Sequence, residues 1–379
     1  MSPAPLRITI VLGAFFPVPP ILGGAVEKFW FAVGQEFARR GHHVVQISRS
    51  FRGFPEREEI AGVQHSRVRG FETPASLWRL KLLDLIYSLG VRRVLPPADI
   101  LVTNTFWLPF LMRTERCGKV YVHVARVPKG QMRFYSHAAR LQALSSAVSN
   151  SIKTEAPALA ARTRVIPYAT RQAATEPEPI SEREHILLFV GRVHPEKGVH
   201  LLVEAFTREM SSALVGWKLM IIGPTRTEQG AGGAPYLARL KDLAGGTDRI
   251  EFRGPIFEAD PLEREIQRAR IFVYPSLAER GETFGLAALE AMSAGCAVVV
   301  SDLACFHDFI ADEQTGFIFN HRATDPVESL QATLRNLSSD PELVSRVAVA
   351  GRQKSTEYSI ENVATQFLND FEEVIREHA

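Results

Sequence analysis

Two cations in the second half of the chain could hold an anionic group. Arg192 and Lys197 lie in the segment Gly191–Gly198, which follows an apolar run and precedes a helical pattern. A helix N-terminus suits a phosphate, because it offers unpaired N–H groups and the positive end of the helix dipole. The arginine can grip phosphate oxygens as a fork and the lysine adds a point charge, so together they could neutralise a departing diphosphate. The alternative is an ordinary strand-to-helix turn with solvated basic residues.

Two glutamates eight residues apart form the second candidate. Glu282 lies in a predicted loop, a helix begins near Phe284–Leu286, and Glu290 lies one to two turns into that helix. The spacing of roughly 12 Å lets the carboxylates touch different parts of one ligand, such as a sugar hydroxyl and a ribose. The alternative is one glutamate that stabilises the helix dipole and a second, unrelated one. We favour a functional pair, because Glu290 falls in the apolar segment LAALEAMSAG, where a carboxylate needs a partner.

The first half of the chain carries weaker signals. Gly23 and Gly24 precede the first predicted helix, and paired glycines let a backbone approach a ligand closely. The loop is not a G-x-G-x-x-G segment, which places a dinucleotide oxidoreductase last among the candidate functions. His123 lies near the end of a predicted strand in KVYVHVARV, where the sites of α/β proteins gather. A structural histidine is the alternative there.

Alternating strands and helices must position these residues. Short β-branched runs alternate with helical periodicity, which predicts mostly parallel sheets covered by helices. The polar segment Gln172–His185 contains two prolines and predicts a linker between two α/β domains. The predicted strands are Ile8–Leu12, Val44–Ile47, Ile100–Thr103, Val120–Val124, Arg164–Pro167, Ile186–Val190, Lys218–Ile222, Ile250–Phe252, Ile271–Tyr274 and Ala297–Ser301. The predicted helices include Ala25–Arg40, Val199–Phe206, Leu286–Ala294 and Ile360–His378.

Composition bounds the class of protein. The 379 residues suffice for two domains, and 46% of them are hydrophobic, so each domain can bury a core. Residues 1–180 hold 24 Lys and Arg against 12 Asp and Glu, a net charge of +12, and the remainder carries −10. The first half should therefore attract anionic partners, although a solvated basic surface is the alternative. Nucleic acid is not favoured, because no motif for it is present and the second half is acidic.

Cysteine usage and hydropathy indicate the compartment. Cys117, Cys296 and Cys305 are odd in number and far apart, which argues against a disulfide framework or a zinc site. The first residues lack the basic and apolar regions of a signal peptide, and no stretch of about 20 apolar residues is present. We expect a cytoplasmic protein, with the inner face of the membrane as one place where it could work.

Taken together, these residues resemble the retaining glycosyltransferases of family 4, which have the GT-B fold. The family pattern appears in order as Gly23-Gly24, His123, Gly191-Arg192 with Lys197-Gly198, and Glu282 with Glu290. The resemblance implies an α/β GT-B architecture of two Rossmann-like domains, with mostly parallel sheets facing a central cleft. It implies an N-terminal acceptor domain over residues 1–175, a donor domain over 176–359, and a C-terminal helix at about 360–379 that crosses back to the first domain.

The resemblance also implies roles for individual residues. Arg192 and Lys197 would bind the donor diphosphate, Glu290 the ribose and Glu282 the transferred sugar, while His123 would contact the sugar near the reacting carbon. The implied catalytic residues are His123, Glu282, Arg192 and Lys197. The implied donor-binding residues are Gly23, Gly24, Gly191, Arg192, Lys197, Glu282, Thr283, Phe284, Gly285, Leu286 and Glu290. No cofactor and no metal ion are expected, and the absence of an Asp-x-Asp motif fits a site where Arg and Lys replace a metal.

The chain departs from the family pattern at two main places. The usual Asn-Gly after the strand before the linker is Tyr168-Ala169 here. The usual glycine-rich turn and glutamate after V-V-x-S are replaced by Leu303–Asp308, LACFHD. A further small difference is RGETFG around Glu282, in place of the commoner E-G-F-G. The change at Leu303–Asp308 bears on contacts around the donor sugar or phosphates.

The expected function is therefore transfer of a hexose-type sugar, with retention, from a nucleotide-diphosphate sugar to a hydroxyl acceptor. UDP is favoured over GDP as the carrier, and the acceptor is a carbohydrate or glycolipid, as in polysaccharide or glycolipid synthesis. The alternatives are a GT-B nucleotide-sugar epimerase, a phosphorylase and a non-catalytic nucleotide-sugar-binding protein.

Two basic segments of the first half could serve the acceptor. Ser76–Leu95 mixes large apolar and basic residues and could be a membrane-surface helix, which would allow peripheral association with the membrane. Packing of this helix on the sheet is the favoured alternative. Arg126, Lys129 and Arg133 could bind an anionic acceptor or form a solvated loop.

Overall fold

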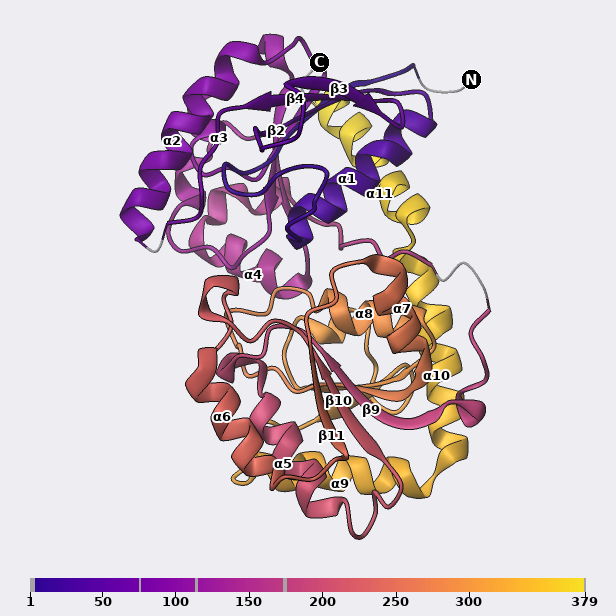
Figure 1. The fold of residues 1–379 in the computed structure, drawn as a ribbon. Helices are drawn as coiled ribbons and strands as arrows, with labels where there is room; N and C mark the ends of the chain where they lie inside the picture. The colour runs from indigo at the N-terminus through magenta and orange to yellow at the C-terminus, as the bar shows by residue number, and fades with distance from the viewer. Residues whose placement is uncertain (1–3, 75, 113–114, 173–175, 378–379) are drawn as a thin grey trace. The chain divides into compact units, whose positions relative to one another are not determined.

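The computed structural model describes residues 4–74, 76–112, 115–172 and 176–377, and it divides into two compact units. The N-terminal unit contains Met1–Ala169 and Ile360–Ala379, and the C-terminal unit contains Thr170–Ser359. The predicted domain boundary after residue 175 and the last residues of the predicted C-terminal helix lie outside the described residues. Each unit is an α/β domain built on its own sheet (Figure 1).

The N-terminal unit contains an eight-stranded sheet in the order β3-β4-β2-β1-β5-β6-β7-β8. Every pair is parallel except β3 with β4. The strands are β1 (Arg7–Val11), β2 (His43–Arg49), β3 (Arg57–Ile60), β4 (Val63–Val68), β5 (Ile100–Thr103), β6 (Lys119–Val124), β7 (Arg140–Ala143) and β8 (Thr163–Val165). The helices are α1 (Ala25–Arg39), α2 (Leu77–Val94), α3 (Leu108–Leu111), α4 (Ser146–Glu155) and α11 (Ile360–Glu377), with short 3₁₀ turns at Glu115–Cys117, Met132–Phe134 and Pro157–Arg162.

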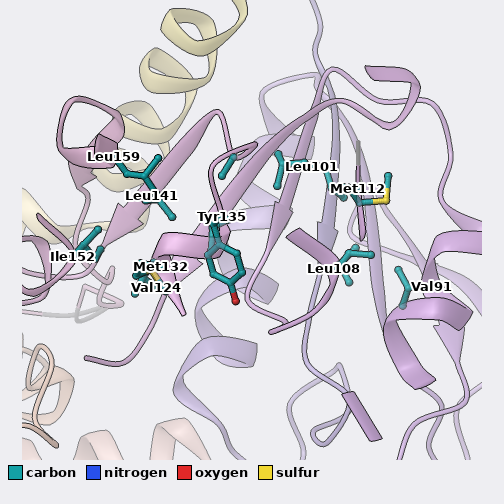
Figure 2. Close-up of a cluster of buried hydrophobic side chains, with 14 of the residues drawn as sticks. Val91, Leu101, Leu108, Met112, Val124, Met132, Tyr135, Leu141, Ile152 and Leu159 are labelled. Atoms are coloured by element: carbon teal, nitrogen blue, oxygen red, sulfur yellow. The ribbon is translucent and has the colours of Figure 1, made fainter. Parts of the chain in front are cut away.

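One core of this unit lies beneath α2, α3 and α4. Side chains from these helices meet side chains from β5, β6 and β7, and they are all buried. Figure 2 shows Val91, Leu101, Leu108, Met112, Val124, Met132, Tyr135, Leu141, Ile152 and Leu159 of this cluster. Burial of such side chains is the main driving force for folding, at about 25 cal/mol for each Å² of apolar surface.

The C-terminal helix belongs to the N-terminal unit, as the fold prediction required. Phe367 and Phe371 of α11 pack on aromatic rings of α1 and β6, with Trp30 at 4.9 Å and Tyr121 at 5.0 Å between ring centroids. Apolar residues at three- and four-residue spacing form the buried face, which is why the sequence pattern could predict this helix.

The C-terminal unit contains a six-stranded parallel sheet in the order β11-β10-β9-β12-β13-β14. The strands are β9 (Glu184–Val190), β10 (Lys218–Ile222), β11 (Ile250–Gly254), β12 (Ala269–Tyr274), β13 (Ala297–Ser301) and β14 (Phe317–Phe319). The helices are α5 (Val199–Glu209), α6 (Gly233–Ala244), α7 (Ala259–Arg268), α8 (Leu286–Ser293), α9 (Pro326–Ser339) and α10 (Pro341–Ser355). Short 3₁₀ turns lie at Ile180–Glu182, Pro195–Lys197, Thr227–Gln229, Phe306–Asp308 and Thr356–Tyr358.

The predicted fold class of two mostly parallel α/β sheets is confirmed. All ten predicted strands are present, with ends that move by a few residues. Four strands were not predicted, namely β3, β4, β7 and β14. The first three carry polar or charged residues in place of β-branched runs, and the last has three residues, so their sequences gave no strand pattern.

Candidate functional site

The topology of the C-terminal sheet brings two loops together at one edge. The strand that follows β9 in the chain, β10, lies on one side of it, and β12 lies on the other side. Because β9 and β12 are neighbours, the loops that follow them start side by side at the carboxyl end of the sheet and then run in opposite directions. Parallel α/β sheets form their ligand sites at such a point, because helix N-termini and loop backbones are free there. All four charged residues of the sequence hypothesis lie on these two loops or on the helix α8 that follows.

Lys197 and Glu282 meet at this edge, although 85 residues separate them in the sequence. Lys197 Nζ donates a hydrogen bond of 2.7 Å to Glu282 Oε2. The side chains are only 9% and 10% exposed, and the ammonium lies 5.4 Å from the ring centroid of Tyr274. A buried lysine is stable only when a carboxylate and further polar contacts offset its loss of water. The loops thus hold a positive charge at a defined place beside the sheet.

A glycine sets the position of this lysine. Gly198 has φ of 66°, and a Cβ atom there would overlap the carbonyl oxygen of Pro275, the first residue after β12. Only glycine fits a left-handed backbone under such a close contact. The neighbouring hydrogen bond from Leu277 N to Glu196 O, 2.8 Å, fastens the two loops to each other. The K-G pair of the sequence motif therefore places Lys197 against the loop that carries Glu282.

Tyr274 and Cys305 complete the surroundings of Glu282, and the sequence analysis assigned neither to the site. Burial and the neighbouring Glu282, which accepts a hydrogen bond from the tyrosine, hold the pKa of Tyr274 well above its ordinary value. Burial raises the pKa of the Cys305 thiol, and the charge of Glu282 raises it further. Both groups therefore stay protonated near neutral pH. A tyrosine at the end of an apolar strand gave no signal in the sequence, whereas Cys305 lies in the segment Leu303–Asp308 that the sequence marked as a departure near the donor.

Arg192 lies at the more exposed side of the same loop. Its guanidinium donates to Glu196 Oε1 at 2.5 Å and to the carbonyl oxygen of Gly230. Burial opposes ionisation of Glu196, but the hydrogen bond and charge of Arg192 outweigh it and hold the pKa of that carboxyl below its usual value. Arg192 has to exchange this carboxylate for a phosphate if it binds one. Glu196 is a further residue that the sequence analysis did not select.

The segment around the second glutamate has the predicted form. Thr283 and the buried Phe284 lead to Gly285, and α8 begins at Leu286, within the range predicted. Gly285 has φ of 88°, and a Cβ atom there would overlap the ring of Phe306. Glu290 lies on α8 and is partly buried. The helix thus carries Glu290 one turn beyond the loop that holds Glu282.

The turn that replaces the family's glycine-rich segment lies beside the same residues. It forms the 3₁₀ turn Phe306–Asp308 after β13, and Phe306 packs edge-on against Tyr274 with 6.1 Å between ring centroids. Phe306 is therefore held between Tyr274 and Gly285. An aromatic ring and a thiol therefore lie in this turn close to Tyr274 and Glu282.

The two glycines of the N-terminal unit precede α1 as predicted. Gly23 and Gly24 have φ of 79° and 95°, and Gly24 is the N-cap of α1. The carboxylate of Glu27 turns back to this end of the helix, where it accepts a hydrogen bond from its own backbone N–H, and a Cβ atom on Gly24 would overlap it. Burial raises the pKa of Glu27 to about 6. Glu27 ends the segment Gly23–Glu27 that the sequence marked as a candidate, but no role was predicted for it.

His123 is enclosed by side chains of its own unit. It lies in β6, only 2% exposed, and its Nδ1 atom pairs with Gln142. Its ring stacks on Phe29 at 6.0 Å and lies 5.9 Å from Tyr168, one of the residues that departs from the family pattern. Burial lowers the pKa of His123 to about 4, so the ring is neutral. These surroundings suit the structural alternative, and contact with a donor sugar stays a prediction.

The described residues contain neither a cluster of metal ligands nor a helix that could span a membrane. No three His, Cys, Asp or Glu side chains in the described ranges are grouped closely enough to ligate a metal ion. Over the same ranges, no helix has both the length and the apolar composition to span a bilayer.

Comparison with known proteins identifies relatives of both sequence and fold. Residues 184–340 match the family model described as "Glycosyl transferases group 1". The chain is 32% identical over 195 residues to a lipopolysaccharide 1,2-N-acetylglucosaminetransferase of Salmonella typhimurium, which covers 50% of this chain and 48% of that protein. It is 29% identical over 194 residues to the alpha-maltose-1-phosphate synthase of Mycolicibacterium smegmatis, with coverage of 50% and 48%. The matches thus span about half the length of these curated relatives.

Solved structures resemble nearly the whole chain. The sucrose-phosphate synthase of Thermosynechococcus elongatus superimposes with a TM-score of 0.80 at 18% identity, over 98% of this chain and 100% of that one. HepE of Anabaena, solved in complex with UDP and glucose, gives a TM-score of 0.70 at 16% identity, over 97% and 99%. At these identities the likeness establishes the fold.

Proposed function

We propose that this chain, whose residues 184–340 match the model of the group 1 glycosyl transferases and which has the GT-B fold, transfers a sugar from a nucleoside-diphosphate sugar to a hydroxyl acceptor. The observation that carries the proposal is the ion pair of Lys197 with Glu282 at the switch point of the C-terminal sheet, with Arg192 on the same loop. Two cations at the carboxyl edge of such a sheet suit a diphosphate.

The geometry supports a mechanism of partner exchange. Each cation is held by a carboxylate in the structure, Lys197 by Glu282 and Arg192 by Glu196. A diphosphate that binds between the cations would take over these contacts and free Glu282 to accept a hydrogen bond from a sugar hydroxyl. As the bond from sugar to phosphate breaks, negative charge grows on the leaving oxygen, and fixed cations stabilise that charge more than they stabilise the bound donor.

The finer parts of the proposal concern the donor and the stereochemistry. We propose a hexose carried by UDP, which the UDP complexes of HepE support by analogy of fold. We further propose that Glu290 holds the ribose and that the product retains the anomeric configuration of the donor. As the bond from the sugar to the phosphate breaks, the oxygen of the acceptor hydroxyl would bond to the sugar carbon. The leaving phosphate would help to remove the proton of that hydroxyl.

The decisive experiment compares two lysine variants. We expect Lys197→Ala to lower UDP release from UDP-glucose, measured with a panel of hydroxyl acceptors and with EDTA present, by at least about 100-fold. Lys218→Ala is the matched control, because Lys218 is exposed at the amino end of β10, the opposite edge of the sheet, and should keep full turnover. Equal turnover in both variants would refute the proposed role of the ion pair.

The same assay separates the alternative functions. An epimerase would convert the donor with no acceptor present, and a phosphorylase would require inorganic phosphate. A binding protein would show donor binding without turnover. Donor binding is read independently by thermal shift, because a ligand at 100 times its dissociation constant adds about 2.7 kcal/mol of stability.

A further inference from the structure

The exposed apolar side chains of the N-terminal unit gather on one helix. Of the 14 large hydrophobic residues that are exposed among the described residues, six lie on α2. They are Leu77, Trp78, Leu82, Ile86, Leu89 and Val94. Trp78 is 72% exposed, and in Figure 1 α2 runs along one flank of its unit beside α3. Single exposed apolar residues are ordinary on soluble proteins, whereas a cluster of this kind marks an interaction surface.

The helix has two distinct faces. Asp84, Tyr87, Ser88 and Val91 are buried against the unit, and this anchors α2 to the core shown in Figure 2. At 100° for each residue, the wheel places Trp78, Leu82, Ile86 and Leu89 within about 80° of one another on the opposite side. We call these four residues the outer stripe. It extends over about 17 Å of helix at 1.5 Å for each residue.

Basic side chains border the outer stripe on both sides. The wheel places Arg79 along one edge and Lys81 and Arg92 along the other, while Arg93 falls in line with the stripe one turn beyond Leu89, and all four are exposed. The one acidic residue of the helix, Asp84, is buried, where it accepts hydrogen bonds from the backbone N–H groups of Phe106 and Trp107 at 3.1 Å. The surface that α2 presents to solvent therefore combines apolar side chains with charged side chains that are all cationic.

We propose that the outer stripe and its basic borders bind the surface of an anionic membrane. Apolar side chains would enter the boundary between headgroups and acyl chains, while arginine and lysine reach to lipid phosphates. A tryptophan suits that boundary, because its ring is apolar and its N–H stays hydrogen-bonded. Cations on both sides of the stripe fit an extended sheet of negative charge. The alternative favoured from sequence, packing on the sheet, accounts for the inner face of α2 and leaves the outer stripe uncovered.

The test uses the full chain and needs no sugar donor, so it is independent of the proposed enzymatic function. Flotation with vesicles of phosphatidylcholine plus 30% phosphatidylglycerol should recover the protein, and pure phosphatidylcholine should recover little. Each basic residue near an anionic surface contributes about 1 kcal/mol, so Arg79→Gln and Arg92→Gln should each lower the partition coefficient about fivefold. Raising the salt concentration should weaken binding in the same direction.

The apolar part is tested with a pair of matched variants. Replacing the outer stripe by Trp78→Ser, Leu82→Ser, Ile86→Ser and Leu89→Ser should abolish flotation. Val215→Ser with Val349→Ser is the control, because both valines are as exposed as the stripe and lie in the C-terminal unit. Circular dichroism and the melting temperature verify that each variant is folded. Comparison with Trp78→Phe isolates the emission of Trp78 from that of the other three tryptophans, and this emission should shift to the blue on anionic vesicles and be quenched by brominated lipid.

Three outcomes would overturn the proposal. The first is failure of the folded chain to bind anionic vesicles. The second is binding that survives the four serine substitutions. The third is a dimer of the unmodified chain in sedimentation that the four serine substitutions dissociate, together with no recovery of either protein by vesicles. A second copy of the chain would then cover the stripe.

Discussion

Each unit contains a buried ion pair, and the two pairs differ in how tightly they are enclosed. In the N-terminal unit, Arg140 of β7 is 1% exposed and lies 2.9 Å from Asp370 of α11, which also accepts a 2.7 Å hydrogen bond from Tyr121. In the C-terminal unit, Lys197 and Glu282 lie at a loop edge and are 9% and 10% exposed, against 1% for Arg140 and 7% for Asp370. The first pair fastens a helix to a sheet, and the second has a side that a ligand could reach.

Burial determines the chemistry of the enclosed pair. It raises the pKa of Asp370 even though Tyr121, Arg140 and Arg164 all favour the ionised carboxylate. Desolvation therefore outweighs attraction, which is the usual balance for enclosed charges. Such a pair contributes little net stability but is costly to break, because each partner would remain buried without the other. A lysine at a loop edge can instead move its ammonium on a flexible stem when its partner leaves.

The largest effect is predicted for a substitution that breaks the enclosed pair of Arg140 and Asp370. Asp370→Ala should lower the free energy of unfolding by about 3–5 kcal/mol, because Arg140 and Tyr121 lose their buried partner. Glu282→Gln should cost only about 1 kcal/mol of stability, yet it should lower turnover strongly if Glu282 orients the sugar. Urea denaturation and the UDP-release assay measure the two quantities. A stability loss in Glu282→Gln as large as that in Asp370→Ala would remove the distinction between the pairs.

The second prediction concerns the buried histidine of the N-terminal unit. Its folded-state pKa of about 4 lies below the unfolded value of about 6.5, so the unfolded chain binds the proton first as pH falls. The stability that neutral His123 contributes is complete above pH 6.5 and is lost as pH falls toward 4. Relative to the unmodified chain, His123→Phe should gain about 2 kcal/mol between pH 7 and pH 5.

The matched control for this pH effect is His137→Phe, because His137 is exposed. It should leave the pH dependence of urea denaturation unchanged. Parallel stability curves for the unmodified chain and His123→Phe over this pH range would show that His123 titrates normally. The ring would then be accessible to water, and the structural interpretation of His123 would be wrong.

Sequence alone predicted those parts of the site that have a regular spacing. The helical period and the glycine turns placed Arg192, Lys197, Glu282 and Glu290 on the correct loops and helix, because local backbone geometry follows from local sequence. Contacts between loops depend on the order of the strands instead. Lys197 follows β9 and Glu282 follows β12, and only the β9–β12 neighbourhood brings these two side chains together.

Strands that the local sequence did not predict also depend on partners from other elements. β7 contains Arg140 and Gln142, which look like surface residues in the sequence. They are buried because α11, more than 200 residues later, supplies Asp370, and because β6 supplies His123. Partners so distant in sequence leave no local pattern.

The third prediction tests the role of Tyr274, which lies beside the pair of Lys197 and Glu282. Tyr274→Phe removes the hydroxyl that hydrogen-bonds Glu282 and leaves the aromatic stack on Phe189 in place. A hydrogen bond to a charged group is worth about 1.5 kcal/mol or more, so kcat should fall about tenfold. Tyr236→Phe is the control, because its hydroxyl bonds His200 and is not among the contacts of Glu282. An equal loss in both variants would indicate a general structural effect.

The last prediction concerns the thiol next to Glu282. Burial and the nearby carboxylate both raise the pKa of Cys305, so thiolate is scarce there at pH 7.5. In a chain with Cys117→Ser and Cys296→Ser, a disulfide reagent should react with native Cys305 at least about 100 times more slowly than with free cysteine. Addition of denaturant should restore the fast rate. Rapid labelling of the native chain would mean that Lys197 outweighs Glu282 at the sulfur, and the loop-edge pair would then present net positive charge to the turn Phe306–Asp308.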